Sequence, residues 1–188
     1  MESLKIKEKK LERIIIESGK CAVAYSGGVD SLYLLNKCHE LLKESVMAVT
    51  LKTPLTPERE FNFAVREAEK IGARHTVIER GIEDFSWFEN NPDDRCYICK
   101  NAGFSLIKQE ALKYGIDTIF DGTNIDDMDD YRPGMKAVKE LGIISPLKEA
   151  GLTKDEIRQL SKEMGITGYD RASFTCLATR FPTGSKIE

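Results

Sequence analysis

The feature that most constrains the fold is a glycine-rich stretch that joins an apolar run to a helical pattern. Residues 24–31 read Ala-Tyr-Ser-Gly-Gly-Val-Asp-Ser and overlap the end of an apolar run from Cys21 to Tyr25. Beyond them, apolar residues recur at helical spacing from Leu32 to Leu42. The sequence therefore predicts a strand, a tight turn and the start of a helix in direct succession.

The paired glycines suit this turn to phosphate binding. Gly27 and Gly28 carry no Cβ and can take positive φ, so backbone N–H groups can point inward at the positive end of the following helix. Ser26 and Ser31 add hydroxyl donors, whereas Asp30 would repel phosphates unless a cation such as Mg²⁺ lies between them. The stretch therefore indicates a cradle for metal-bridged phosphates. The alternative is an ordinary strand-to-helix turn with a Ser or Asp cap.

The order of these residues separates the loop from two other phosphate-binding patterns. It has neither the G-x-x-x-x-G-K-[ST] of Walker ATPases nor the G-x-G-x-x-G of dinucleotide folds. Ser-Gly-Gly-Val-Asp-Ser resembles instead the PP-loop of ATP pyrophosphatases, enzymes that split ATP between the α- and β-phosphates and leave AMP on a substrate. The resemblance implies that residues 26–31 bind ATP with Mg²⁺.

Composition is typical of a single globular domain. A chain of 188 residues is long enough to bury a substantial core. Its net charge of −3 gives no support to a strongly basic nucleic-acid surface, so a nucleic-acid partner is not expected. No apolar run approaches the roughly 20 residues of a membrane span, and the lysines from Lys5 to Lys10 are not followed by a signal-peptide core. We therefore expect a cytoplasmic protein with reduced cysteines or metal-bound thiolates.

Strand and helix patterns alternate along the whole chain. This alternation predicts an α/β domain over residues 1–188, with a five-stranded parallel sheet covered by helices on both faces. The expected strands are Cys21 to Tyr25, Val46 to Leu51, Arg74 to Ile78, Thr118 to Asp121, and Ile143-Ile144.

Ligands in such sheets bind at the carboxyl ends of the strands. That edge collects the glycine-rich loop, the segment after Leu51, and the run from Asp121 through Gly122 to Asn124. Gly122 and Asn124 are therefore candidate nucleotide-binding residues. By resemblance to PP-loop proteins, the backbone at Thr50 and Leu51 is a candidate for contact with adenine. The acidic residues that follow are either a solvated loop or a site that holds metal or substrate: Asp126, Asp127, Asp129 and Asp130.

The cysteines fall into two groups. Cys21 and Cys38 lie in apolar patterns and are expected in the core. Cys96 and Cys99 form a C-x-x-C at a helix start, a spacing that suits a metal, a cluster or a redox pair, or else two surface thiols with no joint role. Only Cys176 stands in another polar segment, and no further Cys or His pattern completes a four-ligand zinc site. Three thiolates around a cubane cluster would leave one iron open to an exogenous sulfide.

Several motifs together resemble the LarE family of ATP-dependent sulfur transferases, which have the Rossmann-like adenine nucleotide alpha hydrolase fold. The family helps to build the nickel-pincer nucleotide cofactor of lactate racemase. The motifs are the loop at 26–31, Asp-Asp-Arg-Cys-Tyr-Ile-Cys-Lys at 93–100, Asp-Gly-Thr-Asn-Ile-Asp-Asp at 121–127, Asp-Tyr-Arg-Pro-Gly at 130–134 and Cys-Leu-Ala-Thr-Arg at 176–180.

The resemblance implies a two-step reaction. A carboxylate of a pyridinium mononucleotide is adenylated with loss of pyrophosphate, and sulfur then displaces AMP to give a thiocarboxylate. Asp30 would hold Mg²⁺, Cys176 would take part in sulfur transfer, and Arg180 would bind an anionic group of the substrate. Family members either sacrifice the cysteine that matches Cys176 or hold a 4Fe-4S cluster; the presence of Cys96, Cys99 and Cys176 together favours the cluster, fed by sulfide or cysteine.

The resemblance also sets expectations beyond the site. Family members form homo-oligomers and continue into a C-terminal segment, which this chain is expected to lack after Glu188. Departures from the family pattern lie at Thr179, at Thr183 and before Ser173, where Ser, Tyr and Pro respectively are expected. Two other functions remain open at this point. A PP-loop tRNA thiolase would also use a three-cysteine cluster, although Val29 and the acidic balance count against it, and a non-catalytic ATP-binding module would bind nucleotide without releasing pyrophosphate.

Overall fold

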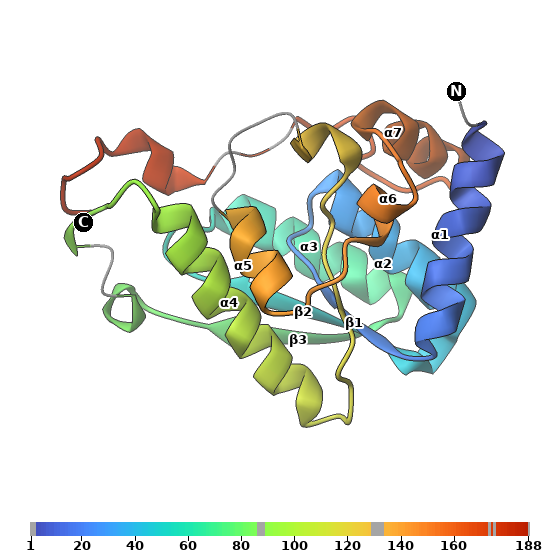
Figure 1. Ribbon diagram of the computed structural model, residues 1–188, viewed down its shortest axis with the longest axis horizontal. Coiled ribbons are helices and arrows are strands. Elements are labelled where there is room, and N and C mark those ends of the chain that lie inside the picture. The colour runs from blue at the N-terminus through green and yellow to red at the C-terminus, as the bar shows by residue number, and fades with distance from the viewer. Residues whose placement is uncertain (1–2, 86–88, 129–133, 173, 175, 188) are drawn as a thin grey trace.

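The computed structural model describes residues 3–85, 89–128, 134–172, 174 and 176–187, with the side chains of two of these, at 82 and 128, left aside (Figure 1). Its helices are α1 (Leu4–Ser18), α2 (Val29–Leu42), α3 (Glu58–Ile71), α4 (Arg95–Leu112), α5 (Gly134–Glu140), α6 (Pro146–Glu149) and α7 (Lys154–Glu163). Its strands are β1 (Cys21–Ala24), β2 (Val46–Lys52), β3 (Arg74–Glu79) and β4 (Ile119–Phe120). Short 3₁₀ turns are η1 (Lys43–Ser45), η2 (Ile82–Asp84), η4 (Ile125–Met128) and η5 (Leu177–Arg180). None of the helices in this part of the chain is both long and apolar enough to cross a membrane.

The four strands form one parallel sheet in the order β3-β2-β1-β4. Cys21 pairs with Val46 and Ala24 with Val49, so β1 and β2 end at the same edge. β1 therefore lies in the interior of the sheet, between a strand that follows it in sequence and one that comes almost a hundred residues later. This position brings the loop after β1 next to the loops after β2 and β4.

The sheet has four strands, so the expectation of a fifth at Ile143-Ile144 is wrong. Ile144 forms only an isolated parallel bridge with Phe120. Its N–H donates to Ile119 O at 3.0 Å, and its carbonyl accepts from Asp121 N at 3.0 Å. Gly142 ends the preceding helical segment and Pro146 begins α6, so there is room for one paired residue and no more.

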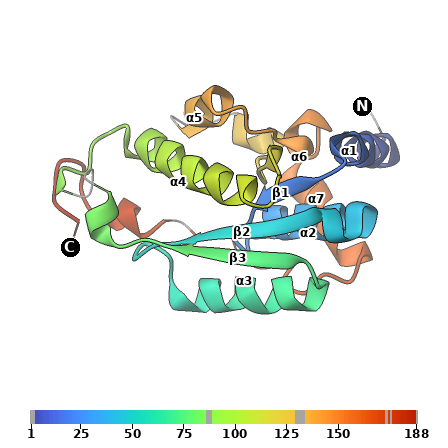
Figure 2. The same cartoon turned by 90° about the horizontal axis from the view of Figure 1, so that it is seen from below.

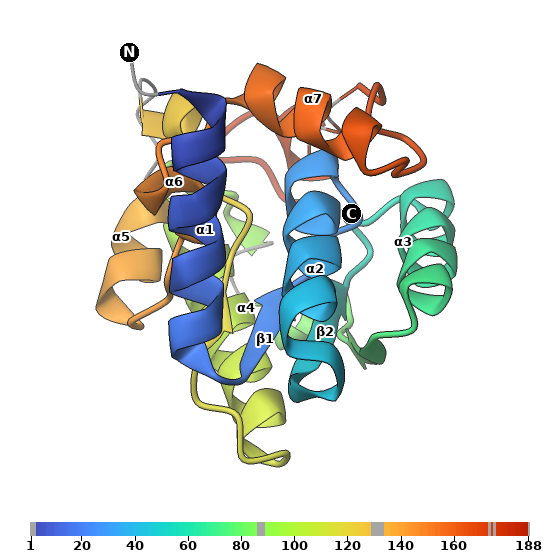
Figure 3. The ribbon, with the colours of Figure 1, turned by 90° about the vertical axis from the view of Figure 1, so that its right-hand side faces the viewer.

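Helices cover both faces of the sheet, as the alternation of patterns predicts. Along β1, Cys21 and Val23 belong to the core with α1, α2, α3 and α7, while Ala22 between them belongs to the core with α4 and α5. Figure 2 shows α3 and α4 on opposite sides of the sheet, and Figure 3 shows α1 and α2 side by side with α7 across one end of them.

A third, smaller apolar cluster lies away from these two cores. It consists of Leu55, Phe85, Ala178 and Ile187, with Leu51, Ile98, Cys99, Ala102, Leu177 and Phe181 packed against it. This cluster joins the loop after β2, the start of α4 and the C-terminal segment. Trp87, in the segment before α4, lies outside the described residues.

Candidate active site

The glycine-rich loop between β1 and α2 is packed tightly against α3. Gly27 has φ of 77°, and a Cβ built there would lie 2.6 Å from Ala64 Cβ. Tyr25 is buried, and its hydroxyl donates to Ala64 O at 3.1 Å. Gly28 differs from the expectation of positive φ, because its φ is −69° and it precedes the first residue of α2. Gly27 alone of the pair therefore requires the conformational freedom of glycine.

The two serine hydroxyls of the loop face each other. Ser31 Oγ donates to Gly28 O at 3.1 Å and lies 3.1 Å from Ser26 Oγ. Ser26 N donates to Ser31 Oγ at 3.3 Å. Since the proton of Ser31 is used by the Gly28 carbonyl, Ser26 is the donor between the two hydroxyls. Both side chains line the same cavity, where an anion could take over these hydrogen bonds.

Buried polar groups near the end of β2 form hydrogen bonds to the residue that begins the loop. Thr50 is 3% exposed, and its hydroxyl donates to Tyr25 O at 2.7 Å. His75 Nε2 lies 2.8 Å from the same hydroxyl oxygen, so it must be the donor in that bond. Burial lowers the pKa of His75, which keeps the imidazole neutral and leaves Nδ1 without a proton. His75, to which the sequence assigned no function, thus helps to position the loop.

The end of β4 closes the site from the other side. A Cβ at Gly122 would lie 2.9 Å from Ser31 N, so the close approach of this loop to the start of α2 requires glycine. Asn124 is 3% exposed; its N–H donates to Asp127 Oδ2 at 3.0 Å, and its side-chain amide lies beside Asp30. The structure therefore places Asn124 and the loop at 26–31 at the same edge of the sheet.

Asp30 is the charged centre of this edge. One carboxylate oxygen, Oδ2, lies 2.5 Å from Lys154 Nζ, while the other, Oδ1, is buried and has no hydrogen-bond partner. Burial raises the pKa of Asp30, the interaction with Lys154 opposes the rise, and the charge of Asp127 adds to it. A buried carboxylate oxygen without a partner, near a second carboxylate, fits a Mg²⁺ ion, which proteins usually hold through one or two carboxylates plus substrate phosphates.

Two cavities meet at this point. The first, of about 370 Å³, lies between the sheet edge and α4 and is walled by apolar side chains such as Val49, Phe104 and Ile107. The second, of about 400 Å³, is bordered by the segment after β2, by Lys154 and Arg171, and by two cysteines. Their shared lining residues are Ser26, Gly28, Asp30, Leu51 and Cys99. Thr50 borders the second cavity and Gly122 the first.

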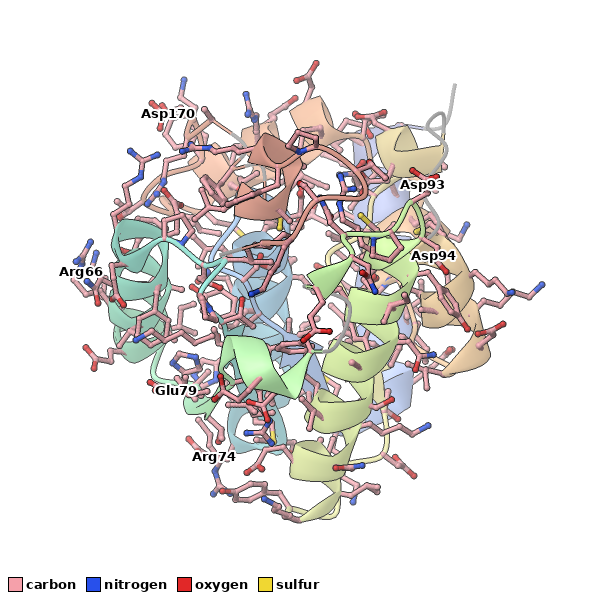
Figure 4. All side chains as sticks on the ribbon, turned by 90° about the vertical axis from the view of Figure 1, so that its left-hand side faces the viewer. Arg66, Arg74, Glu79, Asp93, Asp94 and Asp170 are labelled. Atoms are coloured by element: carbon pink, nitrogen blue, oxygen red, sulfur yellow. The ribbon has the colours of Figure 1, made fainter. Side chains whose placement is uncertain are left out.

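The three candidate cysteines approach the second cavity from two segments. Cys96 and Cys99 lie in the first turns of α4, which begins just after Asp93 and Asp94 (Figure 4), and Cys176 directly precedes η5. Burial, together with the nearby Cys176 and Cys96, raises the pKa of Cys99 to about 11. Partial desolvation and Cys96 also raise the pKa of Cys176, although that residue is exposed. The three sulfurs are therefore close enough to influence one another electrostatically.

These thiols do not form a prearranged metal site. Within the described residues, no group of three or more His, Cys, Asp or Glu side chains is arranged to hold a metal ion. The described cysteines thus do not fit a 4Fe-4S cluster as they stand. Free thiols on a shared cavity wall are what the structure contains.

Asn91 holds the two cysteine-bearing segments together. It is fully buried with φ of 35°, and its Nδ2 donates to Pro182 O at 2.9 Å and to Phe181 O at 3.2 Å. Gly184 N donates to Asn91 O at 3.1 Å. Figures 1 and 2 show the resulting contact between the C-terminal segment and the start of α4. Sequence reasoning missed this residue, although an Asn-Asn-Pro run is a turn signal.

Two cations that the sequence did not single out line the second cavity. Arg180 is exposed at the end of η5, whereas Lys154 and Arg171 line the second cavity. Arg171 Nη2 lies 2.6 Å from Glu60 Oε2, and its guanidinium lies 3.7 Å from the centre of the Phe63 ring. Asp126 accepts from Lys154 N at 2.7 Å and so holds the start of α7. Part of the predicted acidic run, Asp129 and Asp130, lies outside the described residues.

Comparison with known proteins begins with the fold. The chain resembles the structure of the NH3-dependent NAD synthetase from Campylobacter jejuni in complex with the nitrate ion, with a TM-score of 0.68 and 21% identity over 93% of this chain and 80% of that one. Fold and loop together define the class: a PP-loop protein with the adenine nucleotide alpha hydrolase fold, as the loop at 26–31 predicted.

Sequence relatives narrow the class to a family. The chain is 32% identical to the pyridinium-3,5-bisthiocarboxylic acid mononucleotide synthase of Lactiplantibacillus plantarum, over 100% of this chain and 68% of that protein. It is 35% identical to an uncharacterized protein of Synechocystis, over 98% of this chain and 69% of that protein. No family model matches the chain. At this similarity and coverage, the chain belongs to the LarE family of pyridinium-3,5-bisthiocarboxylic acid mononucleotide synthases.

Proposed function

We propose that this protein is an ATP-dependent sulfurtransferase that adenylates a carboxylate of a pyridinium mononucleotide and replaces the activated oxygen with sulfur. The observation that carries the proposal is the meeting of two cavities at Asp30 and the loop at 26–31. One cavity has the apolar walls that an adenine ring needs, and the other has the cations and thiols that an anionic sulfur acceptor needs. The name of the Lactiplantibacillus plantarum relative supports this choice of acceptor.

In the first step, the loop and its supports hold the triphosphate with the α-phosphorus at the junction of the cavities. Ser26, Ser31 and the N–H groups at the start of α2 face the phosphates, and Asp30 with Asp127 nearby would hold Mg²⁺ through oxygen ligands. Bound there, Mg²⁺ would neutralise the phosphate charge. An acceptor carboxylate oxygen in the second cavity attacks the α-phosphorus, the bond to the β-phosphate oxygen breaks, and pyrophosphate leaves.

In the second step, sulfur attacks the activated carbonyl carbon and AMP leaves with the carboxylate oxygen. With the Cys176 thiolate as the attacking sulfur, the product is a thioester to the protein. The thiocarboxylate is released when Cys176 loses its Cα proton and its Cβ–S bond breaks, which leaves dehydroalanine at this position. AMP is a far better leaving group than the oxide of a free carboxylate, so adenylation has to come first. Cys176 and Cys99 line the cavity in which the acceptor would lie. Burial raises the pKa of both thiols and so favours their protonated form, whereas the positive charge of a pyridinium ring would favour the thiolate.

Two sulfur sources are compatible with the cysteine motifs. The described residues hold no prearranged metal ligand set. We propose Cys176, which lines the second cavity, as the residue that meets the acceptor. Anaerobic iron and sulfide analysis separates the two sources. A stoichiometric cluster that disappears in Cys96→Ala would support a cluster, whereas loss of the elements of hydrogen sulfide from the Cys176 peptide after turnover would show a sacrificed cysteine.

The test of the proposed function is product analysis with ATP, MgCl2 and the pyridinium dicarboxylate mononucleotide. We expect AMP and pyrophosphate in equal amounts, formed only when the acceptor is present. Asp30→Asn serves as the inactive control, since it removes the carboxylate with little change of shape. Formation of ADP and phosphate, or a rate that ignores the acceptor, would refute the proposal.

A further inference from the structure

Lys154 forms an ion pair with Asp30, and the proposed function gives this ion pair no role. Its ammonium lies 2.5 Å from Asp30 Oδ2, across 124 residues of sequence, and its side chain is only 25% exposed. The same residue lines the second cavity. The carboxylate at the centre of the site therefore has a cation of the protein itself as a partner.

The main chain of Lys154 is fixed by several contacts. Its N–H donates to Asp126 Oδ2 at 2.7 Å. The preceding Thr153 and the following Glu156 form a capping box, in which Thr153 N donates to Glu156 Oε2 at 2.9 Å and Glu156 N donates to Thr153 Oγ1 at 3.3 Å. Ile125 N donates to Leu152 O at 3.0 Å. Only the side chain of Lys154 is left to move, on a flexible four-carbon stem.

The two carboxylate oxygens of Asp30 have different surroundings. Oδ2 is used by Lys154, while Oδ1 is buried without a partner. A divalent ion at this carboxylate and an ammonium at hydrogen-bond distance from it would repel each other strongly in a partly buried site. The second cavity offers the ammonium another place, beside the phosphate loop, where the negative charge of the nucleotide would attract it.

We propose that Lys154 is a positioning residue, the resident counter-cation of Asp30 in the empty site, and that Mg²⁺ binds by displacing its ammonium into the second cavity. This inference rests on the proposed function, in which Asp30 holds Mg²⁺. Before the metal binds, Lys154 holds the Asp30 carboxylate in a fixed orientation through Oδ2. It therefore competes with the ion that replaces it.

The test is binding of Mg²⁺ alone to the nucleotide-free protein, measured by isothermal titration calorimetry at fixed ionic strength because surface charge effects depend on salt. Lys154→Met removes the ammonium and keeps the length of the side chain. We expect about fivefold tighter Mg²⁺ binding in this variant, the gain from removing a competing ion pair at the upper end of the usual strength. Lys154→Gln carries the same expectation if Lys154→Met does not fold, as judged by circular dichroism.

Lys162→Met is the matched control, because Lys162 is an exposed lysine near the other end of the same helix and the substitution removes the same charge. We expect less than a twofold change of Mg²⁺ affinity in this control. An equal gain in both variants would indicate a general effect of net charge and would overturn the proposal. Unchanged, weaker or undetectable binding in Lys154→Met would also overturn it, because Mg²⁺ would then not compete with the ammonium. Pyrophosphate formation by the wild-type protein decides the proposed function separately.

Discussion

The phosphate-loop region and the cysteine region border the same cavities but are built differently. Around the phosphate loop, polar groups such as Thr50 and Asn124 are buried at strand ends and satisfied by short hydrogen bonds. The cysteines lie on the first turns of one helix and on a C-terminal segment that Asn91 and a small apolar cluster hold in place. The candidate phosphate site is therefore fixed through the sheet, whereas the candidate cysteine site is fixed through a few contacts of a peripheral segment.

The largest effect should come from Asp30, because it carries the charge on which the phosphate region is centred. We expect Asp30→Asn to lower pyrophosphate formation roughly a thousandfold, since losing a metal-held charge costs several kcal/mol of transition-state stabilisation. The variant should keep its fold, because burial disfavours the charged form of this carboxyl group. The measurement is steady-state pyrophosphate release alongside thermal unfolding. A rate within tenfold of the wild-type rate would remove Asp30 from the mechanism.

Substitutions at Gly27 and Gly28 test whether the glycine-rich loop is packed tightly against α3. Gly27→Ala adds a methyl group against Ala64 at positive φ, so we expect the free energy of unfolding to fall by about 2–4 kcal/mol. Gly28→Ala is the control: its φ is negative and its nearest neighbour is Ser26 Oγ at 3.4 Å. There we expect about 1 kcal/mol or less. Urea unfolding of both variants gives the answer, and equal losses would show that close packing is not specific to Gly27.

A substitution at Asn91 tests how the cysteine region is held in place. Asn91→Ala removes two side-chain hydrogen bonds in a buried position, at a cost of about 1–3 kcal/mol. Because the segment is peripheral, we expect the loss to appear as local opening: faster alkylation of Cys176, with a small change in global unfolding. Peptide mass spectrometry after timed iodoacetamide treatment measures this rate. Asn90→Ala, at the exposed neighbouring position, is the control and should leave the rate unchanged. A large loss of global stability in Asn91→Ala would place this segment in the main core.

The smallest effect concerns the anchor of α7, which carries Lys154 to the phosphate region. Lys7 Nζ lies 2.8 Å from Glu156 Oε1, joining α1 to α7. Burial would raise the pKa of Glu156, but Lys7 and the hydrogen bonds of the cap lower it below its usual value. Stability from a lowered carboxyl pKa is present above the unfolded pKa and is lost as pH falls through the folded pKa.

Lys7→Met should therefore lower the free energy of unfolding by about 0.5–1 kcal/mol at neutral pH. The deficit should shrink below pH about 4 and vanish once Glu156 is protonated in both proteins. Urea unfolding over a pH series measures it, with Lys5→Met at an exposed position of α1 as the control. A deficit that stays constant from neutral to acidic pH would show that the ion pair is not its cause.

The placement of the loop at 26–31 and Asn124 at one edge of the sheet could be predicted because it follows from local rules. A strand, a glycine turn and a helix start need only nearby residues, and parallel strands bring their carboxyl ends to one edge. That is why the loop at 26–31 and Asn124 could be expected together. Local rules do not predict how many residues of a short apolar segment pair with the sheet. Ile144 forms a single bridge, and the expected fifth strand is therefore absent from the described residues.

Long-range pairing of charges could not be predicted in the same way. Thr153 and Glu156 form a capping box that fixes where α7 begins, but nothing local in the sequence indicates that Lys154 meets Asp30. Arg180 was preferred by resemblance, and the structure places it exposed on η5. The cysteine pattern likewise indicated which residues lie near one another but not how their sulfurs are arranged. A C-x-x-C restricts the positions of Cys96 and Cys99 relative to each other, whereas it says nothing about the position of Cys176.

The most direct test of the account is the fate of the acceptor's carboxylate oxygen. The acceptor is prepared with a heavy oxygen isotope in its carboxylates and turned over with unlabelled ATP in unlabelled water, and the AMP is analysed by mass spectrometry. Adenylation at the junction of the two cavities predicts that each AMP formed with thiocarboxylate carries one heavy oxygen. AMP without the label would contradict the account, because the carboxylate would not have attacked the α-phosphorus.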